Sequence, residues 1–168
     1  MAIDFSKISV LLVEDSLPMQ QLISSMLEEF GVKQTHIADN GEQGYAKFCL
    51  ERPDIVIADW MMQPEDGIDL VKKIRTDDKS PNFVCPVIML TGYNSMKRVM
   101  MARDAGVTEY LVKPFTATDI ANRLAYVINE PRDFIDCKDF FGPDRRRRID
   151  LGFKGPFRRN TDTDVEVR

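Results

Sequence analysis

The sequence predicts an α/β fold in which a five-stranded parallel sheet is covered by helices on both faces. Short runs of apolar and β-branched residues alternate with stretches whose apolar residues recur at helical spacing. The runs are continuous rather than alternating, as in Ile55-Val56-Ile57, which is typical of strands buried on both faces. Alternating strands and helices favour parallel strands joined by right-handed crossovers.

The first two strand–helix pairs lie within residues 8–50. Residues 8–13 form an apolar, β-branched run, and a helix is expected between Ser16, a candidate cap, and Gly31, a terminator. Pro18 is tolerated in the first turn of that helix. Residues 34–38 form a weaker strand, and the turn Asp39-Asn40-Gly41 separates it from a helix over residues 42–50.

Three further pairs complete the predicted sheet. The expected strands are 54–58, 84–90 and 107–112, and each is followed by a helical pattern. The helices are expected over residues 68–75 and 95–105, and from Thr116 or Thr118 to about 129. The alternation therefore predicts one domain over residues 1–130, with residues 131–168 as a C-terminal tail.

Composition narrows the class of protein. Residues 1–130 contain 13 Lys and Arg against 19 Asp and Glu, whereas residues 131–168 contain 10 and 8. An acidic body is a poor candidate for binding nucleic acid directly. No apolar run approaches the ~18 residues of a membrane span, so no membrane partner is expected. The three cysteines are far apart and odd in number, which favours reduced thiols in the cytoplasm.

Chemically reactive side chains follow four of the five predicted strands. Glu14 and Asp15 follow the first strand, Asp59 the third, Thr91 the fourth and Lys113 the fifth. The carboxyl ends of parallel strands meet at one edge of a doubly wound sheet, where ligands bind. Three neighbouring carboxylates repel one another, and a hard divalent cation such as Mg²⁺ removes that penalty. The set predicts a site that holds a phosphoryl group.

These motifs, in this order, resemble the receiver domain of two-component response regulators, and single-domain chemotaxis receivers in particular. The resemblance covers residues 7–129 and rests on Glu14-Asp15, the stretch DWMMQPEDG from Asp59 to Gly67, Thr91-Gly92 and the stretch YLVKP that ends in Lys113-Pro114. It implies a flavodoxin-like sheet with strand order 2-1-3-4-5. One departure is that Gln63 stands where the family usually has proline, and Pro64 follows it.

The resemblance implies a role for each residue at the strand ends. Asp59 would accept a phosphoryl group from a sensor histidine kinase or a phosphotransfer protein. Asp15, Asp59 and the backbone carbonyl of Met61 would bind Mg²⁺, with Glu14 acting through water. Lys113 would pair with the phosphoryl oxygens, and its bond to Pro114 is expected to be cis.

The resemblance also implies a switch and a partner surface. Thr91 would turn toward the phosphoryl group, Tyr110 would follow it inward, and the face formed by the fourth helix, fifth strand and fifth helix would change for a downstream protein. Met96, Met100 and Met101 on the fourth helix fit either core or an exposed, adaptable patch, since three methionines in six residues cannot all face inward. Whether phosphorylation also produces a homodimer stays open.

The tail over residues 131–168 contains five of the ten phenylalanines, too many for a solvated linker. One interpretation is a docking peptide in which Phe140 and Phe141 are anchors, while Arg145, Arg146, Arg147 and Arg148 pair with acidic groups on this body or on a partner. The alternative is a flexible tail.

Two other function classes compete with the receiver. A haloacid-dehalogenase-type phosphatase would need an acid two residues after the nucleophile, where this chain has Met61. A scaffold that is never phosphorylated would not need all five residues at the strand ends. The chain is therefore expected to be a phosphoryl acceptor with Mg²⁺-dependent self-phosphorylation and dephosphorylation, not an enzyme that acts on other substrates.

Overall fold

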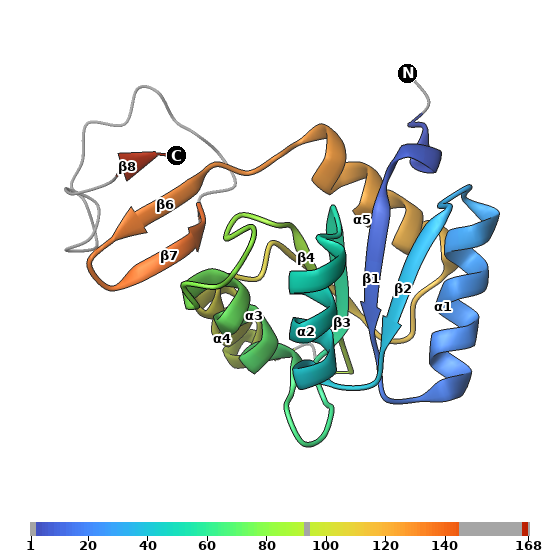
Figure 1. Cartoon of the computed structure of the whole chain (residues 1–168), viewed down its shortest axis with the longest axis horizontal. Coiled ribbons are helices and arrows are strands. Elements are labelled where there is room, and N and C mark those ends of the chain that lie inside the picture. Colours follow the sequence, from blue (N-terminus) through green and yellow to red (C-terminus); the bar gives the residue numbers. More distant parts are fainter. Residues whose placement is uncertain (1–2, 93–94, 145–165, 168) are drawn as a thin grey trace.

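The computed structural model describes residues 3–92, 95–144 and 166–167, and its main sheet has five parallel strands in the order β2-β1-β3-β4-β5 (Figure 1). This order confirms the predicted fold class. The strands are β1 (Ser9–Val13), β2 (Gln34–Ala38), β3 (Ile55–Asp59), β4 (Val87–Thr91) and β5 (Glu109–Val112). The helices are η1 (Phe5–Lys7), α1 (Leu17–Glu29), α2 (Gly41–Glu51), α3 (Gly67–Thr76), α4 (Met96–Ala105) and α5 (Ala117–Asn129).

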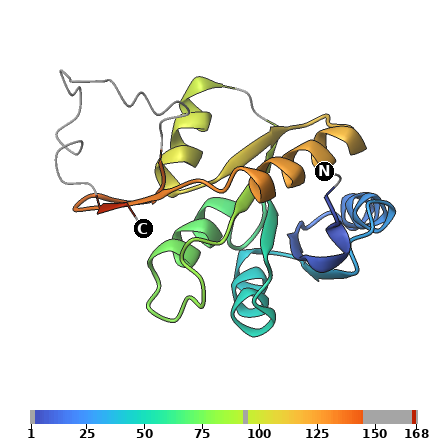
Figure 2. The same ribbon diagram turned by 90° about the horizontal axis from the view of Figure 1, so that it is seen from above.

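The helices cover the two faces of the sheet unequally. On one face α1 and α5 bury Ile23, Leu27 and Leu124 against the sheet. The other face is covered by α2, α3 and α4 (Figure 2). There α2 and α3 bury Phe48 and Ile74, whereas α4 has Ala102 as its one buried residue and a partly buried Ala105. Because β3 and β4 are buried along their whole length, their continuous apolar runs match the sandwiched position that the sequence predicted.

β1 and β3 begin one residue later than the sequence predicted, and β4 and β5 begin two or three residues later. β4 starts at Val87 rather than Val84, because Pro86 has no N–H to donate to a ladder and Val84 is exposed in the preceding loop. β5 starts at Glu109 rather than Val107, because the N–H of Val107 closes the end of α4 by donating to Ala102 O. None of these shifts moves a strand's carboxyl end away from the site.

Residues after α5 form a second, small sheet. β6 (Phe134–Cys137) pairs antiparallel with β7 (Phe140–Pro143), and β8 (Glu166–Val167) pairs with the other edge of β6. β7 contacts both α3 and α4, so this hairpin lies against the receiver body at the end remote from the strands' carboxyl ends (Figure 1). Phe140 and Phe141, the predicted anchors, are in β7, whereas the four arginines over 145–148 lie outside the described residues.

Gly67 at the start of α3 lets the backbone pass close to the end of β3. Its N–H donates to Trp60 O, and a Cβ at this position would lie 2.3 Å from Asp59 O and 2.9 Å from the Sδ of Met89. Replacing Gly67 by alanine is expected to lower the free energy of unfolding by about 2 kcal/mol or more, because backbone must move. Urea denaturation measures the loss.

Gly92 provides the matched control for this substitution. A Cβ on Gly92 meets nothing within 4 Å, so Gly92→Ala is expected to leave stability within about 0.5 kcal/mol of the parent. Equal denaturation midpoints for Gly67→Ala and the parent would contradict the close approach.

Candidate functional site

The carboxyl edge of the sheet gathers the acidic residues that the sequence placed there. Asp59 is the last residue of β3, and Glu14 and Asp15 follow β1. One carboxylate oxygen from each of the three lies within 4.8 Å of the others. Glu14 and Asp59 are buried, while Asp15 is exposed at the mouth of the cluster. The three carboxylates therefore form one concentrated negative site open to solvent on one side.

Lys113, directly after β5, is the cation of this cluster. Its Nζ lies 2.8 Å from Asp59 Oδ1 and 3.3 Å from Glu14 Oε2. Burial raises the pKa of Glu14, and the neighbouring charge of Asp59 raises it further. Burial lowers the pKa of Lys113, but the hydrogen bonds and charges of Asp59 and Glu14 outweigh this effect and raise it overall. Lys113 therefore stays charged and offsets part of the carboxylate repulsion.

The donor set fits a divalent cation. Carboxylate oxygens from three residues converge, and a hard cation such as Mg²⁺ prefers oxygen ligands and retains several waters. One ammonium group cannot neutralise three carboxylates, so the cluster keeps a negative charge that a cation would balance. Asp15, which faces solvent, and Asp59 are the residues that would hold it, with Glu14 beside them.

The two predicted switch residues lie beside this cluster on neighbouring strands. Thr91 ends β4 and is buried, and its carbonyl accepts a hydrogen bond from the Lys113 N–H at 2.7 Å. Tyr110 on β5 is half-buried and packs against the core beneath α4. The Lys113–Pro114 peptide bond is cis, as expected, and so is Gln63–Pro64 in the loop that departs from the family pattern. Rotation of Thr91 and Tyr110 stays a prediction.

Sequence reasoning missed one residue near Asp59. Arg98, in the first turn of α4, has its guanidinium carbon 5.5 Å from the ring centroid of Trp60 and its Nη1 3.9 Å from the Sδ of Met61. Trp60 and Met61 directly follow Asp59, so Arg98 joins the start of α4 to the loop after β3. The available signal was a cation shortly after Thr91, but only the fold shows that it meets an aromatic ring.

The methionines of α4 are all exposed, so the core interpretation is wrong for each. Met96, Met100 and Met101 are 74%, 45% and 49% exposed. Met61, in the loop after β3, is 53% exposed. The loop after β3 and the helix α4 thus both present exposed methionines, and we call Met61, Met96, Met100 and Met101 together the Met surface.

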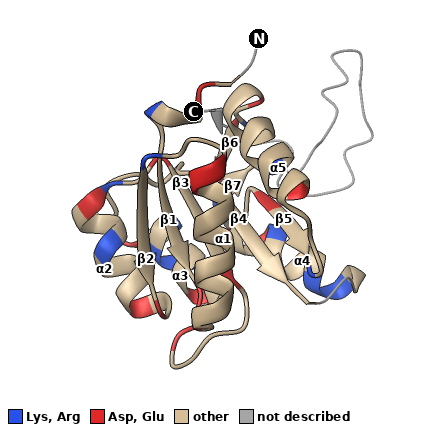
Figure 3. Ribbon diagram, turned by 90° about the vertical axis from the view of Figure 1, so that its right-hand side faces the viewer, with Lys and Arg blue, Asp and Glu red and all other residues tan. Residues whose placement is uncertain are grey.

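The charges elsewhere on the described residues form no single basic face. Basic segments at α2 and at α4 lie on opposite sides of the ribbon, with acidic segments between them (Figure 3). In the part of the chain that the structure describes, no helix has the length and apolar character needed to cross a bilayer.

A doubly wound sheet with an acidic cluster at its carboxyl edge is the arrangement of a receiver-type signalling domain, and comparison with known proteins agrees on the family. The family model described as the response regulator receiver domain matches residues 10–125. The chain therefore belongs to this family and is a two-component response regulator.

The relatives within the family include chemotaxis proteins. CheY-3 of Vibrio cholerae is 34% identical over 115 residues, which are 68% of this chain and 87% of that protein. CheY1 of Helicobacter pylori is 33% identical over 120 residues, which are 71% of this chain and 95% of that protein. The solved structure of CheY4 from Vibrio cholerae has a TM-score of 0.66 at 30% identity, covering 71% of this chain and 98% of that one.

A further solved relative is a complex of CheX, CheY, BeF₃ and Mg²⁺ from Borrelia burgdorferi. It has a TM-score of 0.65 at 25% identity and covers 72% of this chain and 89% of that one. The matched regions leave most of the tail outside the resemblance. The hairpin of β6 and β7 lies beyond the residues that the family model matches.

Asp15→Asn is expected to weaken Mg²⁺ binding about tenfold or more, because it replaces one carboxylate of the cluster by a neutral amide. Trp60, the only tryptophan, is buried beside Asp59, so its fluorescence during Mg²⁺ titration measures the affinity.

Asp78→Asn is the matched control, since it makes the same charge change in the exposed loop before β4. Equal weakening by both substitutions would show that only overall charge matters and that Asp15 is no ligand.

Proposed function

We propose that Asp59 accepts a phosphoryl group from a phosphohistidine of a sensor kinase or phosphotransfer protein. The observation that carries this proposal is the contact of Lys113 with Asp59 inside the acidic cluster. A carboxylate oxygen of Asp59 attacks phosphorus, the phosphorus–nitrogen bond breaks, and the imidazole nitrogen keeps the electron pair and takes up a proton. Lys113 then pairs with the phosphoryl oxygens, while the carboxylates of Glu14 and Asp15 keep the site negatively charged so that it can bind a metal ion.

Bound Mg²⁺ would neutralise charge on the transferring group. We assign its ligation to Asp15, Asp59 and the backbone carbonyl of Met61, with Glu14 acting through water. The chain's own residues supply the rest: Lys113 provides a fixed positive charge, and the Thr91 hydroxyl donates to a phosphoryl oxygen. The protein is accordingly a phosphoryl acceptor, with self-phosphorylation and dephosphorylation as its only chemistry.

Phosphorylation then shifts the equilibrium between two arrangements of α4, β5 and α5. The phosphoryl group adds about −2 charge at Asp59, which favours an inward Thr91 and a following Tyr110. Tyr110 packs beneath α4, whose single buried residue is Ala102, so α4 is the element that its rotation displaces most easily. The change alters the Met surface and Tyr110, which we assign as the contact surface for a downstream protein partner. We place both proteins in the cytoplasm, because Cys49, Cys85 and Cys137 are free thiols and thiols stay reduced there.

Incubation with Mg²⁺ and acetyl phosphate tests the acceptor. Intact-mass measurement is expected to show one added phosphoryl group on the parent protein and none on Asp59→Asn, because Asp59 ends β3 and is the carboxylate of the cluster that lies nearest the Lys113 ammonium, at 2.8 Å against 3.3 Å for Glu14. Asp78→Asn, with the same charge change, should be modified like the parent. A parent protein that stays unmodified, while still binding a partner, would instead favour a phosphorylation-independent scaffold.

The Met surface is tested by alanine substitution of Met96, Met100 and Met101. These exposed side chains contribute little to folding, so stability should change by less than about 0.5 kcal/mol each. Capture of a downstream protein by the phosphorylated chain should weaken several-fold, because the partner loses apolar contact.

Leu50→Ala is the matched control for the Met surface. Leu50 is also exposed and apolar, but it lies on α2. Equal weakening by Leu50→Ala, or none by the three methionine substitutions, would remove the Met surface as the docking site. Size-exclusion chromatography of both phosphorylation states decides whether a homodimer forms.

A further inference from the structure

The hairpin of β6 and β7 is anchored to the receiver body by aromatic rings. Phe134 is buried, and its ring centroid lies 5.8 Å from that of Phe141. Phe141 in turn meets Phe83, in the loop between α3 and β4, edge-on at 6.3 Å. Phe83 belongs to the body, so these rings form a small aromatic contact between the body and the tail.

Beneath these rings lies a buried cation. Arg75 of α3 donates from Nε to Gly106 O, from Nη1 to Phe83 O and from Nη2 to the hydroxyl of Thr108. Among the described residues no carboxylate pairs with it, and the ring of Phe134 covers its guanidinium at 4.9 Å. Burial lowers the pKa of Arg75 to about 10.

Docking of the hairpin is therefore a balance of opposing terms. Burial of aromatic surface and the cation–π contact favour docking, whereas dehydration of Arg75 without a counter-ion opposes it. Departure of Phe134 would let water reach the guanidinium. Undocking of the hairpin would return the Arg75 charge to water, which is favourable. The free energy of undocking is therefore lower than for a segment that covers only apolar side chains.

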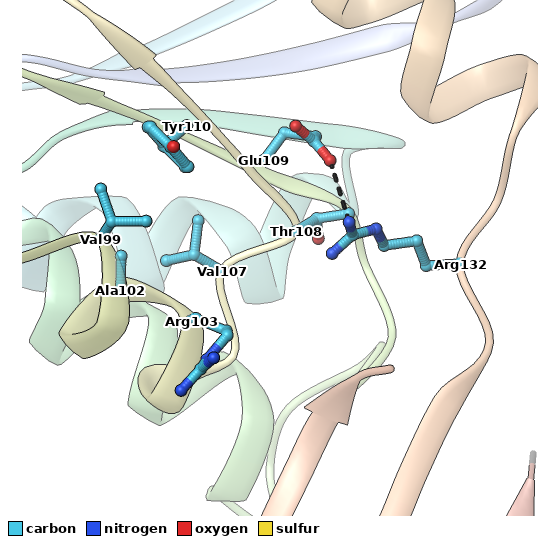
Figure 4. Close-up of a pocket in the computed structure, with 8 residues that line it drawn as sticks. All are labelled: Val99, Ala102, Arg103, Val107, Thr108, Glu109, Tyr110 and Arg132. Atoms are coloured by element: carbon cyan, nitrogen blue, oxygen red, sulfur yellow. Dashed lines mark ion pairs between the residues drawn. The ribbon is translucent and has the colours of Figure 1, made fainter. Parts of the chain in front are cut away.

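A second anchor reaches β5 itself. Arg132, just before β6, places Nη2 3.4 Å from Glu109 Oε1 (Figure 4). Arg123 of α5 places Nη1 3.0 Å from the other carboxylate oxygen, Glu109 Oε2. Glu109 is buried and directly precedes Tyr110. The tail thus holds the residue next to the proposed switch tyrosine.

The hairpin also fixes one end of a loosely packed α4. A cavity of about 230 Å³ lies between α4 and β5, lined among others by Val99, Val107, Tyr110 and Arg132 (Figure 4). At the end of α4, a Cβ on Gly142 of β7 would lie 3.1 Å from the Cα of Gly106. The hairpin therefore touches α4 where the helix ends, while the cavity leaves space beside the rest of it.

We propose that the hairpin, residues 132–144, is an autoinhibitory brace that favours the resting arrangement of α4 and β5 and leaves when Asp59 is phosphorylated. This inference rests on the proposed function. The docked contacts at Glu109 and Gly106 fit the arrangement in which Lys113 pairs with Asp59. Displacement of β5 or α4 weakens both contacts, so docking and phosphorylation oppose each other. By linkage, each must weaken the other by the same factor.

Hydrogen exchange of residues 132–144 measures docking directly. Addition of Mg²⁺ and beryllofluoride, a phosphoryl analogue, is expected to speed exchange of the β6–β7 amides about fivefold or more. Exchange that is unchanged or slower in the analogue-bound protein would overturn the brace.

The reciprocal measurement is beryllofluoride affinity, by titration calorimetry at fixed Mg²⁺. Arg132→Ala removes the contact with Glu109 but leaves that carboxylate paired with Arg123, so the fold is retained. Phe141→Ala weakens docking from the other strand without touching Glu109. Both are expected to bind the analogue about fivefold more tightly than the parent.

Lys138→Ala is the matched control: it removes one positive charge, as Arg132→Ala does, at the exposed turn of the same hairpin. Its affinity should equal that of the parent. Equal affinity in all four proteins would overturn the brace alone. A parent protein that takes up neither beryllofluoride nor a phosphoryl group would overturn the proposed function, and the brace with it.

Discussion

Repulsion among three carboxylates at one sheet edge is the constraint on which the site depends. Glu14, Asp15 and Asp59 lie within 4.8 Å of one another, and two of them are buried. Water cannot fully screen such charges, so the arrangement persists only with cations in place. Lys113 is the fixed one, held by its position directly after β5. The negative charge that Lys113 leaves unbalanced destabilises the resting fold, and a bound divalent cation would offset it.

The sheet holds this edge rigidly, whereas the neighbouring helix α4 is weakly packed. β3 and β4 are fully buried, and Gly67 allows α3 to start against the Asp59 carbonyl. α4 is different, since Ala102 is its only buried residue and its methionines face solvent. Rigid strands hold the reacting groups in register, while a weakly packed helix can change position at little cost. Stability and signalling are thus assigned to different elements.

The sheet and the gathering of its polar strand ends were predictable, because continuous apolar runs and the residues that follow them are local signals. The first residues of the strands were less predictable, since Pro86 cannot donate to the ladder and so moves the beginning of β4 to Val87. Arg75 shows the limit most clearly. It ends a predicted helix as an ordinary basic residue, yet it is buried beneath Phe134. Its burial depends on a segment about sixty residues away, and no local pattern reports such a contact. The tail's phenylalanines indicated packing, but not the partner surface.

β5 connects the two ends of the molecule. Glu109 begins the strand and pairs with the hairpin through Arg132, whereas Lys113 follows its last residue and pairs with Asp59. At about 3.3 Å per residue, the two charged anchors are separated by roughly 13 Å of extended chain. A strand this short, hydrogen-bonded to β4 along its length, cannot stretch to accommodate a shift at one end. Under the proposed function, a shift of Lys113 toward a phosphoryl group would therefore be transmitted along β5 to Glu109, and this would couple the tail mechanically to Asp59.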